Sequence, residues 1–262
     1  MSMGYKNKEL ERGEIPFYIP KESSNAYQAN FLYVDINKRQ DAANSGLFCI
    51  MNENQLPLTV GILIFDQVEV LDVAGPFEVF SVTRLNEERR RQESSPFQIL
   101  LISEMKGQVS AVGGLRFTPD VTIEDCPALD LLIVPGGWGT RKEVKNNTIL
   151  KWIADRATKT RLTASVCTGS SLLGKAGLLE GREATTHWRT FDFLRDAAPT
   201  ATIREDLLFT LDDPIFTSAG VSAGIDLALR IVSHFFGTRI GQATACQMEY
   251  PYPHNDQRRG DT

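Results

Sequence analysis

The stretch 162–177 constrains the fold most strongly, because it places a cysteine between an apolar segment and an amphipathic one. Residues 162–166 are apolar or small and predict a buried strand, and the segment that follows has the spacing of a helix. Cys167 stands at the junction, with Ser165 two positions before it and Gly169 two positions after it. This spacing has the form of a nucleophile elbow, with sulfur at the position where hydrolases of that type carry a hydroxyl.

An elbow of this kind exposes its side chain at the carboxyl end of a parallel strand, next to the first N–H groups of a helix. The positive end of the helix dipole lies there as well. Both effects favour a thiolate, so the sequence predicts a lowered pKa for Cys167. The alternative is a small, buried and inert cysteine, which is the commoner role of this residue.

Apolar strands alternate with helical patterns through most of the remaining chain. Strands are expected at 59–65, 97–102, 129–134, 162–166, 184–188, 202–211 and 215–218, with a hairpin at 109–118. Helices are expected at 73–85, 147–158, 169–177, 188–197, 222–236 and 239–249. This alternation predicts an α/β fold whose mostly parallel sheet is covered on both faces. Four loops at the carboxyl ends of strands are then expected to form the site, and they carry Asp72, Gly136-Gly137, Cys167-Thr168 and His187-Trp188.

Charge and composition exclude several classes of partner. The chain has 262 residues, a formal net charge of −5 and a pI near 5.4, so nucleic acid and anionic membrane surfaces are not expected partners. Its apolar runs are too short to cross a bilayer, and its first residues lack the apolar core of a secretory signal. The four cysteines (Cys49, Cys126, Cys167 and Cys246) lack metal-binding spacing. We expect reduced thiols, a cytoplasmic location and no metal or cofactor.

Three segments differ in composition. Residues 1–57 are rich in Asn, Lys, Glu and Gln, and predict a partly ordered N-terminal extension. Residues 58–253 carry the regular pattern of one domain, and residues 254–262 form a polar tail.

Four short stretches, taken together and in this order, resemble the DJ-1/PfpI superfamily over residues 58–253. They are Leu71-Asp72-Val73-Ala74-Gly75-Pro76-Phe77-Glu78-Val79-Phe80, Val134-Pro135-Gly136-Gly137, Ser165-Val166-Cys167-Thr168-Gly169 and Ala184-Thr185-Thr186-His187-Trp188. The resemblance implies the flavodoxin-like, class I glutamine amidotransferase-like fold, a three-layer sandwich. Within the superfamily the chain is most similar to isonitrile hydratases. The sensor domains of AraC-type regulators carry nearly the same motifs, and residues 1–57 have no counterpart.

For the hydratases, the resemblance implies that Cys167 attacks the terminal carbon of an isonitrile. A thioimidate forms, water adds to it, and an N-substituted formamide leaves. Asp72 stands where the family keeps an acid against the cysteine, and a partly protonated carboxyl there can give a proton to the substrate and later activate water. The alternative for Asp72 is a helix N-cap.

The glycine pair and two further residues complete the expected site. Gly136 and Gly137 let backbone N–H groups approach the reacting atom, with the N–H of Thr168 as a second donor and its hydroxyl beside the sulfur. The alternative for the glycine pair is a simple turn. His187 is expected either to orient the thiolate or to cap a helix and support the fold.

Three functions are therefore open: an isonitrile hydratase acting on a small molecule, another cysteine enzyme of the superfamily (a glyoxalase-type hydratase, an amidase or a peptidase), or a non-catalytic ligand or redox sensor. A regulator would need a DNA-binding module, and residues 237–262 are too few to form one. The resemblance also implies a homodimer.

Overall fold

A seven-stranded sheet organises residues 56–258, the part of the chain that the computed structural model describes. Its strand order is β10-β11-β7-β6-β1-β2-β5. All neighbouring pairs are parallel except β10 with β11, which are antiparallel. The strands are β1 (Leu58–Leu63), β2 (Phe97–Ser103), β5 (Val121–Thr122), β6 (Leu131–Val134), β7 (Leu162–Val166), β10 (Phe209–Asp212) and β11 (Ile215–Ser218). The prediction of a mostly parallel α/β sheet is confirmed.

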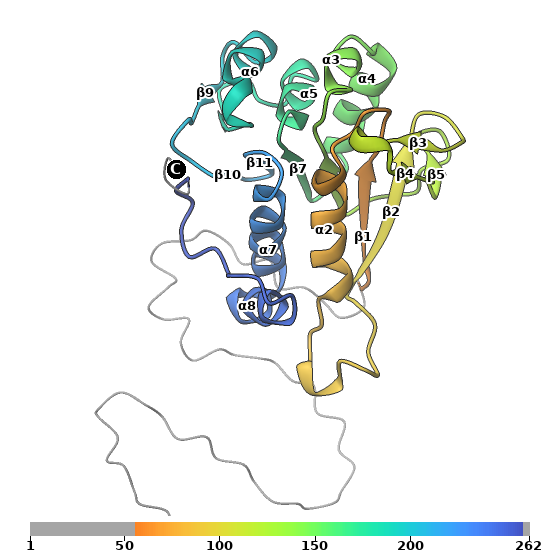
Figure 1. Cartoon of the computed structure of the whole chain (residues 1–262), viewed down its shortest axis with the longest axis vertical. Helices are drawn as coiled ribbons and strands as arrows, with labels where there is room; N and C mark the ends of the chain where they lie inside the picture. The colour runs from red at the N-terminus through yellow and green to blue at the C-terminus, as the bar shows by residue number, and fades with distance from the viewer. Residues whose placement is uncertain (1–55, 259–262) are drawn as a thin grey trace, which may run out of the picture. The chain divides into compact units, whose positions relative to one another are not determined.

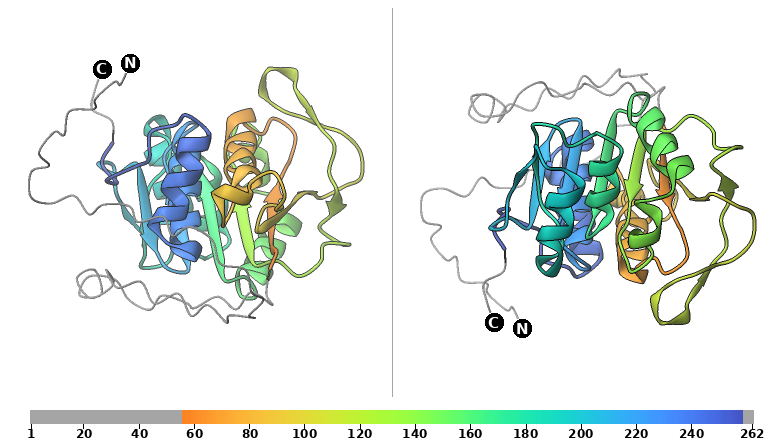
Figure 2. Two further views of the ribbon diagram at one scale, coloured as in Figure 1. Left: turned by 90° about the horizontal axis from the view of Figure 1, so that it is seen from below. Right: turned by 90° about the horizontal axis from the view of Figure 1, so that it is seen from above.

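Helices cover both faces of the sheet, which gives the three layers of a flavodoxin-like sandwich (Figure 1, Figure 2). One layer consists of α2 (Val70–Val82), α7 (Ala223–Phe236) and α8 (Thr238–Gln247). The opposite layer consists of α3 (Thr140–Glu143), α4 (Asn147–Ala157), α5 (Gly169–Lys175) and α6 (Phe191–Ala197). Two small sheets lie outside the main one: β3 (Val109–Ser110) with β4 (Arg116–Phe117), and β8 (Glu183–Ala184) with β9 (Thr202–Ile203).

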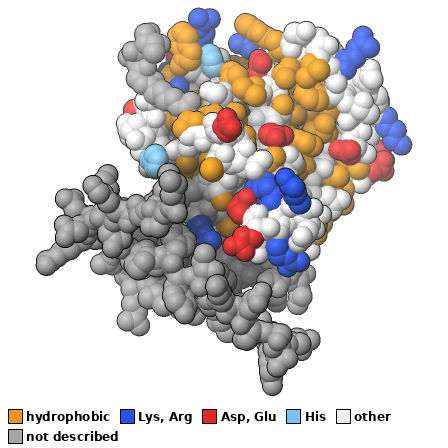
Figure 3. All heavy atoms as spheres, turned by 60° about the horizontal axis from the view of Figure 1, so that its bottom comes forward, with side chains coloured by type: hydrophobic (Ala, Val, Ile, Leu, Met, Phe, Trp, Pro, Cys, Tyr) orange, Lys and Arg blue, Asp and Glu red, His pale blue; other side chains and the backbone are white. Residues whose placement is uncertain are grey.

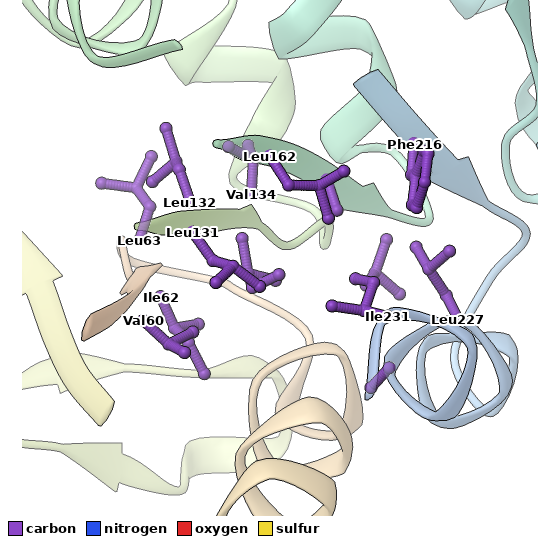
Figure 4. Close-up of a cluster of buried hydrophobic side chains, with 14 of the residues drawn as sticks. Val60, Ile62, Leu63, Leu131, Leu132, Val134, Leu162, Phe216, Leu227 and Ile231 are labelled. Carbon is purple, nitrogen blue, oxygen red and sulfur yellow. The ribbon is translucent and has the colours of Figure 1, made fainter. Parts of the chain in front are cut away.

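The core lies between the sheet and its helices (Figure 4). All four residues of β6 are buried, as are all five of β7, because a parallel strand with helices on both faces has no side exposed to water. The apolar run of α7 belongs to this core, where Leu227 and Ile231 are almost fully buried and face the sheet. The apolar surface of α7 is thus used within the chain.

Helices α2 and α7 approach each other closely, and this contact sets the position of the start of α2. Gly75 faces Ile225, and a Cβ atom at Gly75 would lie 2.9 Å from Ile225 Cγ1. Glycine at this position therefore lets the two backbones pack together, with Asp72 one turn before the contact.

Several boundaries differ from those expected. Helix α2 begins at Val70, three residues before the expected start, so Pro76 lies inside the helix in its second turn. The expected strand 184–188 is largely absent, because β8 spans Glu183–Ala184 and the Thr185 N–H donates to the Thr217 hydroxyl instead of to the backbone of a neighbouring strand. The expected strand 202–211 divides into β9 and β10, because the charged run 204–206 interrupts the apolar pattern.

Most residues of the two expected terminal segments lie outside the described part of the chain. Residues 1–55, most of the expected N-terminal extension, lie outside the described residues, as do 259–262 of the expected tail. Residues 256–258 are described and pair with the segment before β10: Leu207 and Gln257 form an antiparallel bridge. The tail is therefore attached to the domain at this point.

The described surface carries both signs of charge. Figure 3 shows acidic and basic side chains interspersed on one face, with apolar side chains between them. Among residues 56–258, no helix is long and apolar enough to span a membrane.

Candidate active site

Cys167 occupies a strand-to-helix elbow at the carboxyl edge of the sheet. Strand β7 ends at Val166, helix α5 begins at Gly169, and the Cys167 backbone has φ +57°. This left-handed conformation is unusual for a residue with a Cβ atom. Gly169 is required beside it, since a Cβ there would overlap the carbonyl oxygen of Val134 on the neighbouring strand.

Hydrogen bonds fix the strained backbone of Cys167 from both sides. Its N–H donates to the carbonyl oxygens of Ser218 and Ala219, both at 3.2 Å. Its carbonyl oxygen accepts bonds from the hydroxyls of Ser170 at 3.0 Å and Thr186 at 2.9 Å. The conformation is therefore held by the surrounding structure, as strained residues at functional sites generally are.

Asp72 is fully buried in the first turn of α2 and turns toward the glycine loop after β6. Its Oδ2 accepts a hydrogen bond from the Gly136 N–H at 2.9 Å. The N-cap of α2 is Glu69, so the alternative role of Asp72 as a helix cap does not apply. No described residue donates a hydrogen bond of good geometry to its Oδ1, and the Cys167 thiol and the Val221 N–H are the further donors that act on this carboxyl.

The carboxyl of Asp72 and the thiol of Cys167 perturb each other. Burial raises the pKa of Asp72 to about 8, with the charge of Glu69 acting in the same direction. The hydrogen bonds from the Gly136 N–H and the Cys167 thiol oppose this shift. Burial and then the charge of Asp72 raise the pKa of Cys167 well above its ordinary value. The predicted lowering of the cysteine pKa is therefore wrong for this arrangement. Helix α5 has seven residues, and its first N–H groups do not outweigh desolvation of the thiol.

Three donors face the sulfur and oppose this shift. They are the N–H and the hydroxyl of Thr168 and the N–H of Val221, and each favours the thiolate. The Val221 N–H also favours the charged form of Asp72, so it faces both groups. Because the pKa of Asp72 lies below that of Cys167, the pair loses its first proton from the carboxyl and keeps the second mainly on the sulfur.

Gly136 and Gly137 are needed because the loop that carries them lies close to the backbone of Cys167 and Thr168. A Cβ at Gly136 would lie 2.5 Å from the Thr168 nitrogen and 2.9 Å from the Cys167 Cβ. The Gly137 N–H donates to Thr168 Oγ1 at 3.0 Å, and Gly137 itself has φ +127°. The Thr140 hydroxyl, 3.1 Å from Thr168 Oγ1, donates to the Gly137 carbonyl at 2.7 Å. The pair is therefore more than a turn, because it lies directly against the cysteine.

Sequence reasoning missed Val221 and Thr140. Val221 has φ +55°, a conformation that a β-branched residue rarely adopts. Val221 follows β11, whose carboxyl end lies at the same edge of the sheet as that of β7. The place of this loop at the end of a parallel strand could have indicated that Val221 belongs to the site. Thr140 follows the glycine pair by three residues, and no motif in the sequence marked it as part of the site.

His187 has the second of the two roles expected from the sequence, because it caps a helical turn and supports the fold. Its Nδ1 accepts the Arg189 N–H at 3.2 Å and caps the short turn Trp188–Thr190. Its ring packs against Gly220, where a Cβ would overlap Cδ2. Burial and the charges of Arg189 and Arg258 lower its pKa. No hydrogen bond within the described range joins His187 to Cys167 or Asp72, so it supports the loop beside the elbow.

The other described cysteines, Cys126 and Cys246, are free, and Cys49 lies outside the described range. Within residues 56–258, no group of three or more His, Cys, Asp or Glu side chains is arranged to hold a metal ion.

A parallel sheet with a cysteine elbow at its carboxyl edge, an acid against the thiol and a glycine loop beside both defines a flavodoxin-like α/β protein of the glutamine amidotransferase-like type. The DJ-1/PfpI family model matches residues 58–234. The chain belongs to the DJ-1/PfpI family.

The similar proteins include an enzyme and a transcriptional regulator. An isonitrile hydratase of Pseudomonas putida is 37% identical over 210 residues, which cover 79% of this chain and 85% of the hydratase. The HTH-type transcriptional regulator GbdR of Pseudomonas aeruginosa is 29% identical over 205 residues, and the chain spans about half (54%) of its length. Among solved structures, a ThiJ/PfpI family protein from Pseudomonas syringae has a TM-score of 0.66 at 27% identity, covering 84% of this chain and 88% of that one.

Proposed function

We propose that the protein hydrates isonitriles to N-substituted formamides, with Cys167 as the nucleophile. The observation that carries this proposal is the pairing of Cys167 with the buried Asp72, whose carboxyl and thiol perturb each other's ionisation. The similarity to an isonitrile hydratase supplies the substrate class.

In the first step, the pair holds one proton, which rests mainly on the sulfur because the pKa of Asp72 lies below that of Cys167. The Asp72 carboxylate takes this proton and so generates the Cys167 thiolate. The sulfur attacks the terminal carbon of R–N≡C, and the proton of Asp72 passes to that carbon. The product is a thioimidate, R–N=CH–S–Cys167, beside an Asp72 carboxylate. Oδ2 already accepts the Gly136 N–H, so Oδ1 is the oxygen available to carry the proton.

In the second step, Asp72 acts as a base. It takes one proton from a water molecule whose oxygen adds to the thioimidate carbon, and the electron pair of the C=N bond moves to nitrogen. The second proton of the water passes from oxygen to nitrogen as the C–S bond breaks. R–NH–CHO leaves, and the Cys167 thiolate and protonated Asp72 together again hold the one proton with which the cycle began.

The surrounding donors stabilise the charge at each stage. The Thr168 N–H and hydroxyl and the Val221 N–H face the sulfur, where negative charge develops as the thiol loses its proton and returns when the C–S bond breaks. Because Cys167 is only 7% exposed, these hydrogen bonds act with little competition from water.

The proposal is tested by incubating the purified protein with a panel of aliphatic and aromatic isonitriles and measuring formamide by mass spectrometry. Methylglyoxal serves as the competing substrate, because it reports the glyoxalase-type alternative. Formamide production is the expected result. Turnover of methylglyoxal alone would assign the protein to another cysteine chemistry.

A ligand sensor is the second candidate, favoured by the similarity to GbdR over 78% of this chain. In that case an isonitrile or another electrophile would bind or modify Cys167 without turnover. A stable mass increase on Cys167 with no released formamide would support the sensor. A homodimer and a cytoplasmic location stay predictions; light scattering of the purified protein measures the first.

A further inference from the structure

The C-terminal segment 256–258, called the strap below, returns to the domain beside the loop that supports the cysteine elbow. The Leu208 N–H donates to the Asp256 carbonyl at 2.6 Å, and the Arg258 N–H donates to the Asp206 carbonyl at 3.1 Å. These bonds flank the bridge between Leu207 and Gln257 and extend the edge of the sheet before β10.

The side chain of Arg258 then points inward from the strap. Its Nη2 donates to the Thr186 carbonyl at 2.7 Å and to the Thr185 hydroxyl at 3.0 Å. Its Nε donates to the Glu205 carbonyl at 2.6 Å, and its guanidinium lies over the Phe191 ring at 5.1 Å. One planar cation thus joins the loop after β8, the segment before β10 and helix α6.

The two threonines that Arg258 contacts are fully buried and lead to the site. The Thr186 hydroxyl donates to the Cys167 carbonyl at 2.9 Å, one of the bonds that hold the strained elbow. The Thr185 N–H donates to the Thr217 hydroxyl at 2.8 Å, on the strand next to β7. A single residue therefore separates the guanidinium from the backbone of the cysteine.

We propose that Arg258 is a positioning residue for Cys167, acting through Thr186 to hold the elbow in its reactive conformation. Three donors on one rigid fork fix three separate oxygens, so loss of the fork frees the Thr185–Thr186 backbone beneath the elbow. The charge of Arg258 acts independently on His187, which is the next residue along this loop. Only the turnover measurement below depends on the proposed function. The rate of Cys167 alkylation measures the conformation of the elbow whether or not the protein hydrates isonitriles.

The test compares Arg258→Ala and Arg258→Lys with the control Arg204→Ala. Arg204 is a suitable control because its guanidinium binds the carboxylates of Glu183 and Asp206 and contacts neither threonine. Alkylation of Cys167 by iodoacetamide is followed by peptide mass mapping, which separates it from the exposed Cys246. The pKa of His187 is followed by NMR, since the chain has only three histidines.

Arg258→Ala is expected to slow alkylation of Cys167 by about tenfold and to raise the pKa of His187, while Arg204→Ala leaves both unchanged. Arg258→Lys keeps the charge but not the fork, so it is expected to keep the low His187 pKa and to slow alkylation by a smaller factor. Wild-type alkylation rates in Arg258→Ala would overturn the proposal, and so would equal slowing in Arg204→Ala. If Arg258→Ala does not fold, unchanged alkylation in Arg258→Lys overturns it.

Isonitrile turnover is measured on the same variants. A fall in kcat with little change in KM is expected, because the substrate does not contact Arg258. If the wild-type protein has no turnover, the proposed function fails, and the role of Arg258 is still decided by alkylation and by the titration of His187.

Discussion

The Oδ2 of Asp72 accepts a hydrogen bond from the Gly136 N–H at 2.9 Å and joins two positions that are 64 residues apart. This bond ties the first turn of α2 to the loop after β6. It also occupies Oδ2, so Oδ1 is the oxygen that can carry a proton.

Replacement of Asp72 with Asn is expected to stabilise the protein increasingly as the pH rises. Burial raises the folded-state pKa of Asp72 from 3.8 to about 8. Between these two values the unfolded chain loses its proton and the folded chain keeps it. Stability therefore falls by about 1.4 kcal/mol per pH unit through this group, and Asn removes that fall.

Thermal melts at about pH 5 and about pH 7.5 measure this effect, and the Tm advantage of Asp72→Asn is expected to be larger at the higher pH. Glu78→Gln is the matched control, because Glu78 lies on the exposed face of the same helix. A constant difference across this range would mean that Asp72 is ionised in the folded protein.

The reactivity of Cys167 is expected to rise with pH through the first ionisation of the pair, near 8. At lower pH both groups hold protons, and loss of the Asp72 proton leaves a carboxylate that can accept the proton of the Cys167 thiol as the sulfur reacts. Alkylation rates and kcat/KM measured from about pH 6 to about pH 9 follow this step. In Asp72→Asn the step near 8 is expected to disappear, and its persistence would assign it to another group.

An alanine at Gly136 is expected to abolish turnover. Its Cβ would lie 2.5 Å from the Thr168 nitrogen and 2.6 Å from Thr168 Oγ1, and backbone at this position cannot move without moving the elbow. We expect a fall in kcat/KM of more than about 100-fold and a lower Tm. Gly181→Ala is the control, because a Cβ there meets open space far from the site and costs only the strain of alanine at φ +68°, so it is expected to lower Tm without lowering kcat/KM. Near-normal activity in Gly136→Ala would show that the glycine loop does not approach the reacting atoms.

Thr168 allows the hydroxyl to be tested by a matched pair of variants. Thr168→Val removes the acceptor of the Gly137 N–H and the hydroxyl that faces the sulfur, whereas Thr168→Ser keeps both. We expect Val to lower kcat by roughly 10- to 100-fold and to destabilise the fold by about 1–3 kcal/mol, with Ser close to wild type. Equal activity of the two variants would limit the role of Thr168 to its backbone N–H.

The sequence was sufficient for the layers and for the loops that meet at the site. Buried strands such as β6 and β7 have runs of apolar or small residues, which are typical of a parallel sheet covered on both faces, and their carboxyl ends predict which loops converge. The elbow was visible as a local pattern, because its strand and helix are both adjacent to Cys167.

Properties that depend on three-dimensional surroundings were not predictable in the same way. The direction of the Cys167 pKa shift was wrong, because desolvation and the charge of Asp72 come from tertiary packing that no local pattern encodes. The strained conformation of Val221 and the contacts of Arg258 in the strap were not predicted for the same reason, because partners far away in the sequence set both of them.

Replacement of Cys167 with Ala tests the central claim most directly. The protein and this variant are incubated with the isonitrile that the wild type converts best, and formamide is measured by mass spectrometry, with circular dichroism to establish that the variant is folded. We predict that the folded variant releases no formamide above the uncatalysed rate. Formamide production at the wild-type rate would contradict the account.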